Sequence, residues 1–400
     1  MSTVATHAAP QLAPIPPLTA EEELYWIALR IVPGLGARRG MALLNTLRTP
    51  QSIFAASPSE LEARGLSPSV AQSMSSGCVF DEAITQQEKM RNLGVSVIPV
   101  FDRRYPPMLS EIFDPPILLF ARGNVELLQT LMLGIVGTRR PTAYGVTVTE
   151  RLAGDLAKLG FTISSGMARG VDTCAHQAAL NCDGNTVAVY GCGIDQVYPS
   201  ENRKLSESIM SKGLVISEYP IGAPAYPQNF PVRNRIISGM SLGVLVVEGA
   251  QYSGSAITAR LAMEQGREVF AVPGNITSKA SWGPNLLIKQ GAKLVQEASD
   301  VAEELTAETR RRVAGQSRNS LFFNEVERTP DVDAAIFAGP MAGVFRSVLS
   351  ALKPDSATQL DTLVESLEGV SSSEIIAALF ELELTGRVRQ LPGKQFVKNI

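Results

Sequence analysis

Cysteine is scarce in this sequence, which has four cysteines among 400 residues. Their positions, Cys78, Cys174, Cys182 and Cys192, lack the spacing of metal ligands. The chain is also much longer than the small secreted domains that depend on disulfides. We therefore expect no metal site, and we expect the protein to work in a reducing cytoplasm.

Long apolar segments are also absent, because no apolar run approaches the ~20 residues that cross a bilayer. The first residues, MSTVATHAAPQLAPIPPL, contain no basic segment followed by an apolar core. They predict a disordered Pro/Ala-rich tail over residues 1–19 rather than a signal peptide. We therefore expect no membrane partner.

An excess of positive charge is missing too, since 36 Lys and Arg stand against 39 Asp and Glu, for a net charge of −3. Such a chain has no overall cationic field, so a nucleic-acid partner would need local clusters of positive charge. Apolar residues make up 45% and charged residues 19% of the chain, which is typical of globular proteins. The length allows two or three domains.

Residues 20–92 predict a small helical domain of the helix-hairpin-helix or SAM-like kind. The apolar residues that repeat at helical spacing are Leu24, Ile27, Ala28 and Ile31. Residues 32–36, VPGLG, then form a tight turn before Arg38 and Arg39. This turn resembles that of a helix-hairpin-helix motif, whose backbone N–H groups can bind a DNA phosphate. The alternative is a helical domain whose Gly-rich turn binds nothing, because a fold can survive the loss of its function.

Residues 93–305 alternate short apolar segments with helical ones. This pattern predicts an extended Rossmann-like domain, with a mostly parallel sheet and helices on both faces. The predicted strands are residues 95–100, 117–120, 131–136, 161–163, 186–190, 214–217, 244–247, 269–272 and 293–295. The predicted helices include residues 171–181, 201–211, 255–265 and 285–290.

Residues 306–339 predict a linker, because arginines there are mixed with Gly, Ser and Asn. This basic run either stays solvated or touches DNA. Residues 340–400 predict a winged-helix domain, with three helices followed by a short hairpin. Its third helix carries Glu374, Glu381 and Glu383, so contact with a protein stands beside contact with DNA as its role.

A βαβ unit from residue 131 to 169 carries the first candidate site. The loop Gly137-Thr138-Arg139-Arg140 follows one predicted strand, and a loop ending in Arg169 follows the next. Ligands of doubly wound sheets bind outside the carboxyl ends of the strands. A glycine that exposes backbone beside an arginine suits a phosphate there, although Arg139 could instead cap a helix or pair with Asp172.

Later loops add candidates for the same edge of the sheet. The run from Phe230 through Arg233, Asn234 and Arg235 places an aromatic beside cations, as a single-strand binder requires. If this run is helical, the two arginines diverge and at least one is structural. Further candidates are Ser253, Gly254 and Ser255 at a strand-to-helix turn, which can form an anion site, and Lys279 after the next strand.

Three titratable residues, Asp172, His176 and Glu248, are candidates for a catalytic role. His176 lies one helical turn after Asp172 and could form an acid–base dyad with it, or be a buried helix histidine. Glu248, at a strand end, could be a catalytic carboxylate or could orient loop amides. No nucleophile or metal set accompanies them, so we expect no catalytic residues.

Six features in order resemble the DprA/Smf family (DNA-processing protein A). They are GTRRPTAYG, SGMARGVDTCAHQAAL, YGCGIDQVYPSEN, FPVRNRIISGMS, VVEGAQYSGSAITARLAMEQGREVFAVPGN and the winged C-terminal unit. The resemblance implies a non-enzymatic homodimer that binds single-stranded DNA, protects incoming DNA in natural transformation and loads the RecA recombinase. It also implies that Arg139 and Arg169 are the main phosphate-binding cations, and that Phe230 stacks on a base beside Arg233 and Asn234.

The alternative function is a nucleotide-processing enzyme similar to the LOG/lysine-decarboxylase-like Rossmann group. Such enzymes carry a PGGxGTxxE motif, whereas residues 248–255, EGAQYSGS, lack its Gly pair and downstream Glu. The sequence also contains no GxxxxGK[ST] motif, which argues against a P-loop ATPase. We therefore expect no cofactor.

Overall fold

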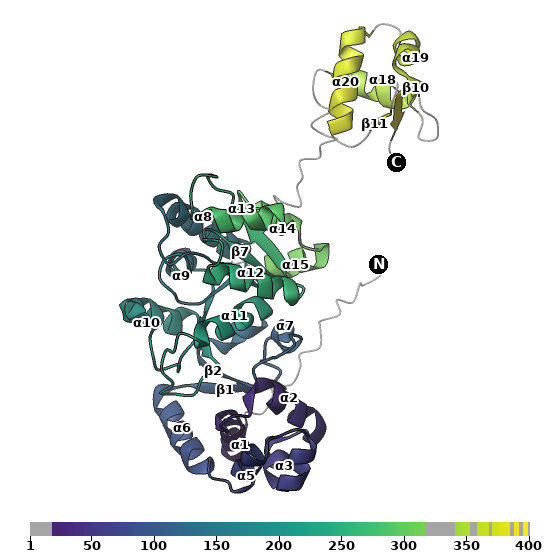
Figure 1. Cartoon of the computed structure of the whole chain (residues 1–400). Coiled ribbons are helices and arrows are strands. Elements are labelled where there is room, and N and C mark those ends of the chain that lie inside the picture. The colour runs from purple at the N-terminus through teal and green to yellow at the C-terminus, as the bar shows by residue number, and fades with distance from the viewer. Residues whose placement is uncertain are drawn as a thin grey trace, which may run out of the picture. The chain divides into compact units, whose positions relative to one another are not determined.

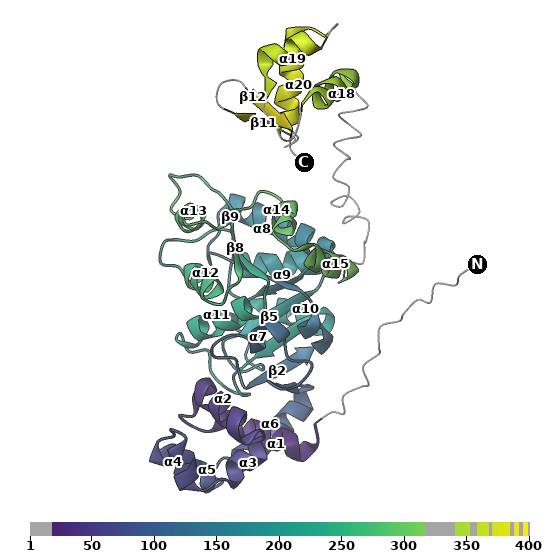
Figure 2. The same ribbon diagram turned by 90° about the vertical axis from the view of Figure 1, so that its right-hand side faces the viewer.

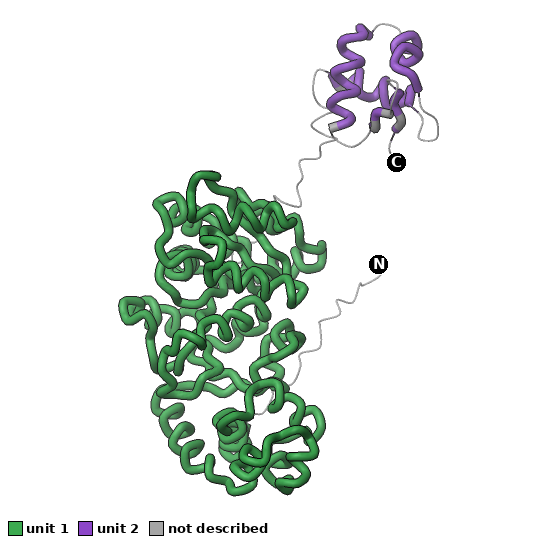
Figure 3. The backbone as a smooth tube through the Cα atoms, viewed as in Figure 1, with its two compact units in different colours: residues 1–320 green, residues 321–400 purple. Residues whose placement is uncertain are grey.

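Contacts between Cα atoms divide the chain into two units, residues 1–320 and 321–400 (Figure 3). The computed structural model describes residues 18–316, 341–352, 358–367, 370–384, 388–391 and 395–398. Most of the predicted Pro/Ala-rich tail lies outside these ranges. In the described part of the chain, no helix has both the length and the apolar character that a membrane crossing requires.

A nine-stranded sheet runs through the first unit in the order β1-β2-β6-β5-β4-β3-β7-β8-β9. Strands β3 to β9 pair in parallel, while β1 and β2 add an antiparallel edge. The strands are β1 Ser96–Pro99, β2 Leu118–Gly123, β3 Met132–Val136, β4 Thr162–Ser165, β5 Thr186–Tyr190, β6 Leu214–Ser217, β7 Gly243–Val246, β8 Glu268–Ala271 and β9 Lys293–Leu294. Strand β3 lies between β4 and β7. From β3 the sheet is extended in one direction by β4, β5 and β6, and in the other direction by β7, β8 and β9. The strand ends beside β3 therefore form a topological switch point.

Helices cover both faces of this sheet, as predicted for the Rossmann-like class. Figure 2 shows α8, α9 and α10 on one side, and α11, α12 and α13 on the other. The helices of this region are α7 Pro107–Ser110, α8 Ala143–Leu159, α9 Val171–Asn181, α10 Arg203–Lys212, α11 Asn229–Gly239, α12 Gly254–Glu264, α13 Trp282–Lys289, α14 Ala298–Glu303 and α15 Ala307–Gln316. Two 3₁₀ helices, Val125–Gln129 and Ser200–Asn202, complete it.

Between residue 18 and the sheet, where the structure describes the chain, there are six helices, so the helical character expected for this region is confirmed (Figure 1). They are α1 Ala20–Ile31, α2 Gly36–Leu47, α3 Pro50–Ala55, α4 Pro58–Ala63, α5 Pro68–Ser75 and α6 Phe80–Leu93. Thr19 and Glu22 form a capping box that begins α1. The side chain of Gln86 on α6 both donates to and accepts from the backbone of Ile221, at 3.0 and 2.9 Å, which joins these helices to a loop of the sheet region.

The start of the predicted linker is helical in the structure. Helix α15 covers residues 307–316, where the mixture of arginine with Gly and Ser predicts irregular chain. The side chain of Gln316 accepts from Leu131 N at 2.7 Å and donates to Gly160 O at 3.1 Å, and Val313 is fully buried. Contacts with residues distant in sequence stabilise this helix, so the composition of residues 307–316 alone does not predict it. Residues 317–339 of the predicted linker lie outside the described ranges.

The second unit has the predicted winged-helix architecture. Helices α18 Ala342–Ala351, α19 Leu360–Ser366 and α20 Ser372–Leu384 surround a three-stranded antiparallel sheet of β10 Thr358–Gln359, β11 Val388–Leu391 and β12 Gln395–Lys398. Ser371 and Glu374 bond reciprocally at the start of α20, as their capping pattern predicts. Phe345, Ile375 and Phe396 are part of a core of their own.

Candidate nucleic-acid interface

Residues from three loops and the start of helix α11 meet in a pocket at the carboxyl ends of β3, β4 and β5, which we call the strand-end pocket. It is lined by Arg139, Gly166, Ala168, Arg169, Tyr198, Pro199, Phe230 and Arg233. Phe230 and Arg233 come from the start of α11, and the loops after three adjacent parallel strands supply the other lining residues. The structure thus brings together four of the predicted residues: Arg139, Arg169, Phe230 and Arg233.

Two exposed arginines stand at this pocket. Arg139 lies between β3 and α8, and Arg169 lies between β4 and α9. Arg169 is already in a bidentate ion pair, with its Nε and a terminal nitrogen 2.6 and 2.9 Å from the two carboxylate oxygens of Glu201. This hydrogen-bonded pair raises the pKa of Arg169 and lowers that of Glu201. A phosphate that binds Arg169 must therefore compete with a carboxylate, whereas Arg139 has no such competitor among the described residues.

Arg233 forms the floor of the pocket and is only 4% exposed. Its guanidinium donates to the backbone oxygens of Gly166, at 2.6 Å, and Val189. The buried carboxylate of Asp172 accepts from the backbone N–H groups of Gly166 and Ala168, at 3.1 and 3.3 Å. Burial raises the pKa of Asp172, and the nearby Arg233 opposes that shift. Arg233 therefore ties the ends of β4 and β5 together in addition to lining the pocket.

Two aromatic rings form the side of the pocket. The ring centroids of Tyr198 and Phe230 are 5.2 Å apart at an interplanar angle of 33°. Phe230 is half-buried, and a Cβ at Gly191 would lie 2.8 Å from its ring, so the absence of a side chain at Gly191 lets the ring approach the backbone. Tyr198 is 45% exposed. Aromatic rings and guanidinium groups are the kinds of group on which the bases of single strands stack in other proteins.

Most of the other predicted residues lie in the loop of Arg139 or against α11, whereas Lys279 lies apart from the strand-end pocket. Gly137, Thr138 and Arg140 share the loop of Arg139, and Asn234 donates to Gly254 O at 3.4 Å, which places the Ser253–Ser255 turn against α11. Ser253 caps α12 by accepting from Ala256 N. Lys279 is exposed in the loop after β8 and does not line the strand-end pocket.

The prediction that Arg235 contacts DNA is wrong. Arg235 is 6% exposed, and its guanidinium is held by Glu218 at 2.8 Å and by Asp114 at 3.1 Å. Because the run from Phe230 is helical, Arg235 points away from Arg233, and both carboxylates that it meets are distant in sequence. A buried cation neutralised in this way has no charge free for a phosphate, so Arg235 is structural.

Glu248 follows β7 in the chain, and its carboxylate lies at the amino end of α8, beside the switch point of the sheet. Its buried carboxylate accepts from the backbone N–H of Thr142 at 2.9 Å and from the Thr142 hydroxyl at 2.6 Å. The interpretation that Glu248 orients loop amides is thus confirmed. In nucleotide-binding Rossmann domains a phosphate sits at the amino end of the helix that follows the first strand. Here the chain's own carboxylate is already bound there, which disfavours the nucleotide-processing alternative.

The buried-histidine interpretation of His176 is confirmed. His176 has no exposed surface, and its Nδ1 hydrogen-bonds Thr186 at 2.6 Å rather than Asp172, whose carboxylate is bound to loop amides. Burial lowers the pKa of His176 from 6.5 to about 3. The imidazole is therefore neutral in the folded protein and serves packing.

This pKa predicts a pH dependence of stability. Below pH 6.5 the unfolded chain binds a proton that the folded chain excludes until about pH 3, so the free energy of unfolding falls as the pH drops through this window. For one proton the slope is about 1.4 kcal/mol per pH unit. Denaturant unfolding of His176→Gln, which cannot titrate, should show a pH dependence in this window that is shallower by that amount. Identical pH dependence in the two proteins would contradict the prediction.

Fold and site together define a class: a Rossmann-like domain with cations and aromatic rings at its strand ends, joined to a winged-helix domain. The family model described as "DNA recombination-mediator protein A" matches residues 96–306, and the model "DprA winged helix domain" matches residues 340–394. The chain therefore belongs to the DprA/Smf family of DNA-processing recombination mediators.

Individual relatives agree with this assignment. Protein Smf of Escherichia coli (strain K12) is 40% identical over 302 residues, which cover 74% of this chain and 76% of that protein. Protein Smf of Synechocystis sp. is 30% identical over 393 residues, covering 94% and 98%. The X-ray structure of DNA processing protein A (DprA) from Streptococcus pneumoniae matches with a TM-score of 0.64 and 35% identity, covering 72% of this chain and 99% of that one.

Among the side chains that can interact with a ligand or its partners, sequence reasoning missed Tyr198, which lines the strand-end pocket, and Glu201, which pairs with Arg169. Both lie in the segment YPSEN, which directly precedes α10. Their signal is weak because nothing local indicates that this loop folds back to Arg169 and Phe230. The expectation that ligands gather outside the strand ends would have justified including them, since the segment follows β5.

Proposed function

We propose that this protein binds single-stranded DNA across the strand-end pocket without catalysing a reaction on it. The main support for this proposal is that one pocket at adjacent strand ends is lined by three arginines and two aromatic rings, which are Arg139, Arg169, Arg233, Phe230 and Tyr198. Guanidinium groups bind the phosphates, and the rings stack on bases in a sequence-tolerant way. The overall net charge of −3 makes this local cluster the basis of the attraction.

Membership of the family supports a wider role. We propose that the protein acts as a homodimer in the cytoplasm, protects incoming single-stranded DNA in natural transformation and loads the RecA recombinase onto it. The remaining predicted DNA-binding residues, Gly137, Thr138, Arg140, Asn234 and the Ser253–Ser255 turn, are proposed to border the DNA path. Lys279 would contact DNA only if the strand extends toward the loop after β8.

The test is binding anisotropy with a labelled single strand and with a duplex of the same length, each with and without ATP. We expect the protein to prefer the single strand, because stacking on exposed rings requires unpaired bases. We also expect no effect of ATP. Equal affinity for the duplex, or dependence on ATP, would overturn the proposal.

A further inference from the structure

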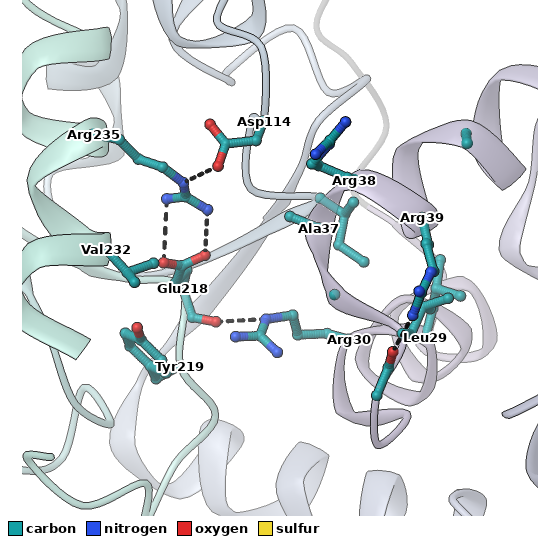
Figure 4. A pocket seen from close by; sticks show the side chains of 15 residues that line it. Leu29, Arg30, Ala37, Arg38, Arg39, Asp114, Glu218, Tyr219, Val232 and Arg235 are labelled. Atoms are coloured by element: carbon teal, nitrogen blue, oxygen red, sulfur yellow. Dashed lines mark hydrogen bonds and ion pairs between the residues drawn. The ribbon is translucent and has the colours of Figure 1, made fainter. Parts of the chain in front are cut away.

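A second pocket, of about 770 Å³, lies between the first helices and the sheet (Figure 4). Its walls come from the end of α1, the turn before α2, the first turns of α2, the segment before β2, the segment after β6 and helix α11. We call it the α2 pocket. The side chains that give it its character are Arg30, Arg38, Arg39, Glu218, Tyr219 and Arg235.

Arginines outnumber carboxylates in the α2 pocket, since Arg30, Arg38, Arg39 and Arg235 line it with Asp114 and Glu218. Glu218 and Asp114 both bind Arg235, and the guanidinium bridges them in Figure 4. Arg30 donates to the backbone oxygen of Glu218 at 2.7 Å, and its Cζ lies 5.8 Å from the centroid of the Tyr219 ring. Burial lowers the pKa of Arg30. The Glu218 carboxylate opposes that shift, and a further anion bound beside this desolvated cation would stabilise it more.

The start of α2 adds two exposed cations. Arg38 has its Cζ 4.4 Å from the centroid of the Phe113 ring, which is 79% exposed, and Arg39 donates to Gly34 O at 3.2 Å. No described carboxylate forms an ion pair with either arginine. Gly34 and Gly36 have φ of +77° and +68°, which L side chains rarely adopt, and the turn that they permit brings α2 to the pocket.

Helix α11 separates the α2 pocket from the strand-end pocket. Phe230 and Arg233 line the strand-end pocket, whereas Val232 and Arg235 line the α2 pocket. Residues two apart differ by about 200° around a helix, so the two pockets lie on opposite sides of one helical turn. Val232 is 48% exposed at this crossing. A polymer that passes over Val232 can reach both pockets, which a free nucleotide cannot.

We propose that the α2 pocket binds a further phosphate and base of the same single-stranded DNA that occupies the strand-end pocket. Arg38 and Arg39 contact phosphate, and the exposed Phe113 ring offers a base a stacking surface at the rim. The site extends the length of strand that one protein molecule covers. This inference rests on the proposed function, since it assigns a second binding site to the same ligand.

The experiment compares a labelled dinucleotide with a labelled single strand of about 25 nucleotides, because a dinucleotide is too short to reach both pockets around helix α11, which is about 10–12 Å wide. The variant is Arg38→Ala with Arg39→Ala, both exposed. For the longer strand we expect an affinity loss of about tenfold or more, and a slope of log affinity against log salt that falls by about 1.4 for two phosphates. Affinity for the dinucleotide should not change. The matched control is Lys89→Ala with Arg91→Ala on α6, which removes the same charge outside the pocket and should leave both affinities unchanged.

Phe113→Ala provides a second variant that removes no charge. It should weaken binding of the longer strand while leaving its salt slope unchanged. An unchanged affinity for the longer strand in folded Arg38→Ala/Arg39→Ala protein, or equal losses on both lengths, would overturn the α2 pocket as a second subsite. Wild-type protein that binds neither strand would overturn the proposed function itself, so the two failures are distinguishable.

Discussion

Replacing both Arg139 and Arg169 with alanine should cause the largest decrease in single-strand affinity. Hydrogen bonds to charged groups contribute about 1.5–3 kcal/mol each, so each substitution should weaken binding by about tenfold or more. Removing one phosphate-binding cation should also reduce the slope of log affinity against log salt by about 0.7, and the double variant should reduce it by about 1.4. Both side chains are exposed, so the melting temperature should move little. Binding anisotropy at several salt concentrations measures both quantities.

The ion pair between Arg169 and Glu201 supplies a control of opposite sign. Glu201→Gln removes the carboxylate that competes with phosphate for Arg169, so it should raise the affinity for single strands. Arg169→Lys should retain most of the salt slope but lose the bidentate geometry of the guanidinium. If both single alanine variants fold and keep the wild-type slope, the two arginines are structural and the DNA path lies elsewhere.

Phe230→Ala should produce the second large effect, through stacking rather than charge. Stacking of a base on an aromatic ring contributes about 1–3 kcal/mol, so we expect single-strand affinity to fall by about 5- to 150-fold. The salt slope should stay constant, because the substitution removes no cation. Tyr198 can retain part of the stacking, since it is exposed beside Phe230. The measurement is again anisotropy, with thermal unfolding to follow the change in packing over Gly191.

Two further variants separate stacking from folding. Phe230→Trp should restore affinity, because it returns an aromatic face to the site. Phe101→Ala, at an exposed aromatic outside the strand-end pocket, should leave binding unchanged. A Phe230→Ala protein that is less stable yet binds normally would show that this ring is only part of the core.

Much of the parallel sheet could be predicted because its strands are short apolar runs bounded by glycine and polar residues. The predictions for 186–190 and 214–217 match β5 and β6 in both bounds. Buried parallel strands carry this signal within their own sequence. Arg139 and Arg169 could likewise be placed at one edge, since the carboxyl ends of adjacent parallel strands meet there.

Helix α11 could not be assigned from its own residues. Its buried residues include Arg233 and Arg235, which lie on opposite sides of the helix, so a single apolar stripe at helical spacing is missing. The partners that allow these cations to be buried are Glu218, Asp114 and two backbone oxygens, none of which is local. The spacing of residues along the sequence does not reveal ion pairs with distant carboxylates. For this reason the sequence wrongly predicts that Arg235 binds DNA.

The position of Arg233 has a consequence for the speed and cost of binding. Its guanidinium holds the loop after β4 to the end of β5 through the backbone oxygens of Gly166 and Val189, and Asp172 holds the same loop through backbone N–H groups. This loop is therefore preorganised on the protein side of the proposed interface, and it gives up little conformational entropy when a strand arrives. The ordering cost falls instead on the flexible DNA. Strands that are already extended should consequently associate faster than strands that must first lose internal base pairing.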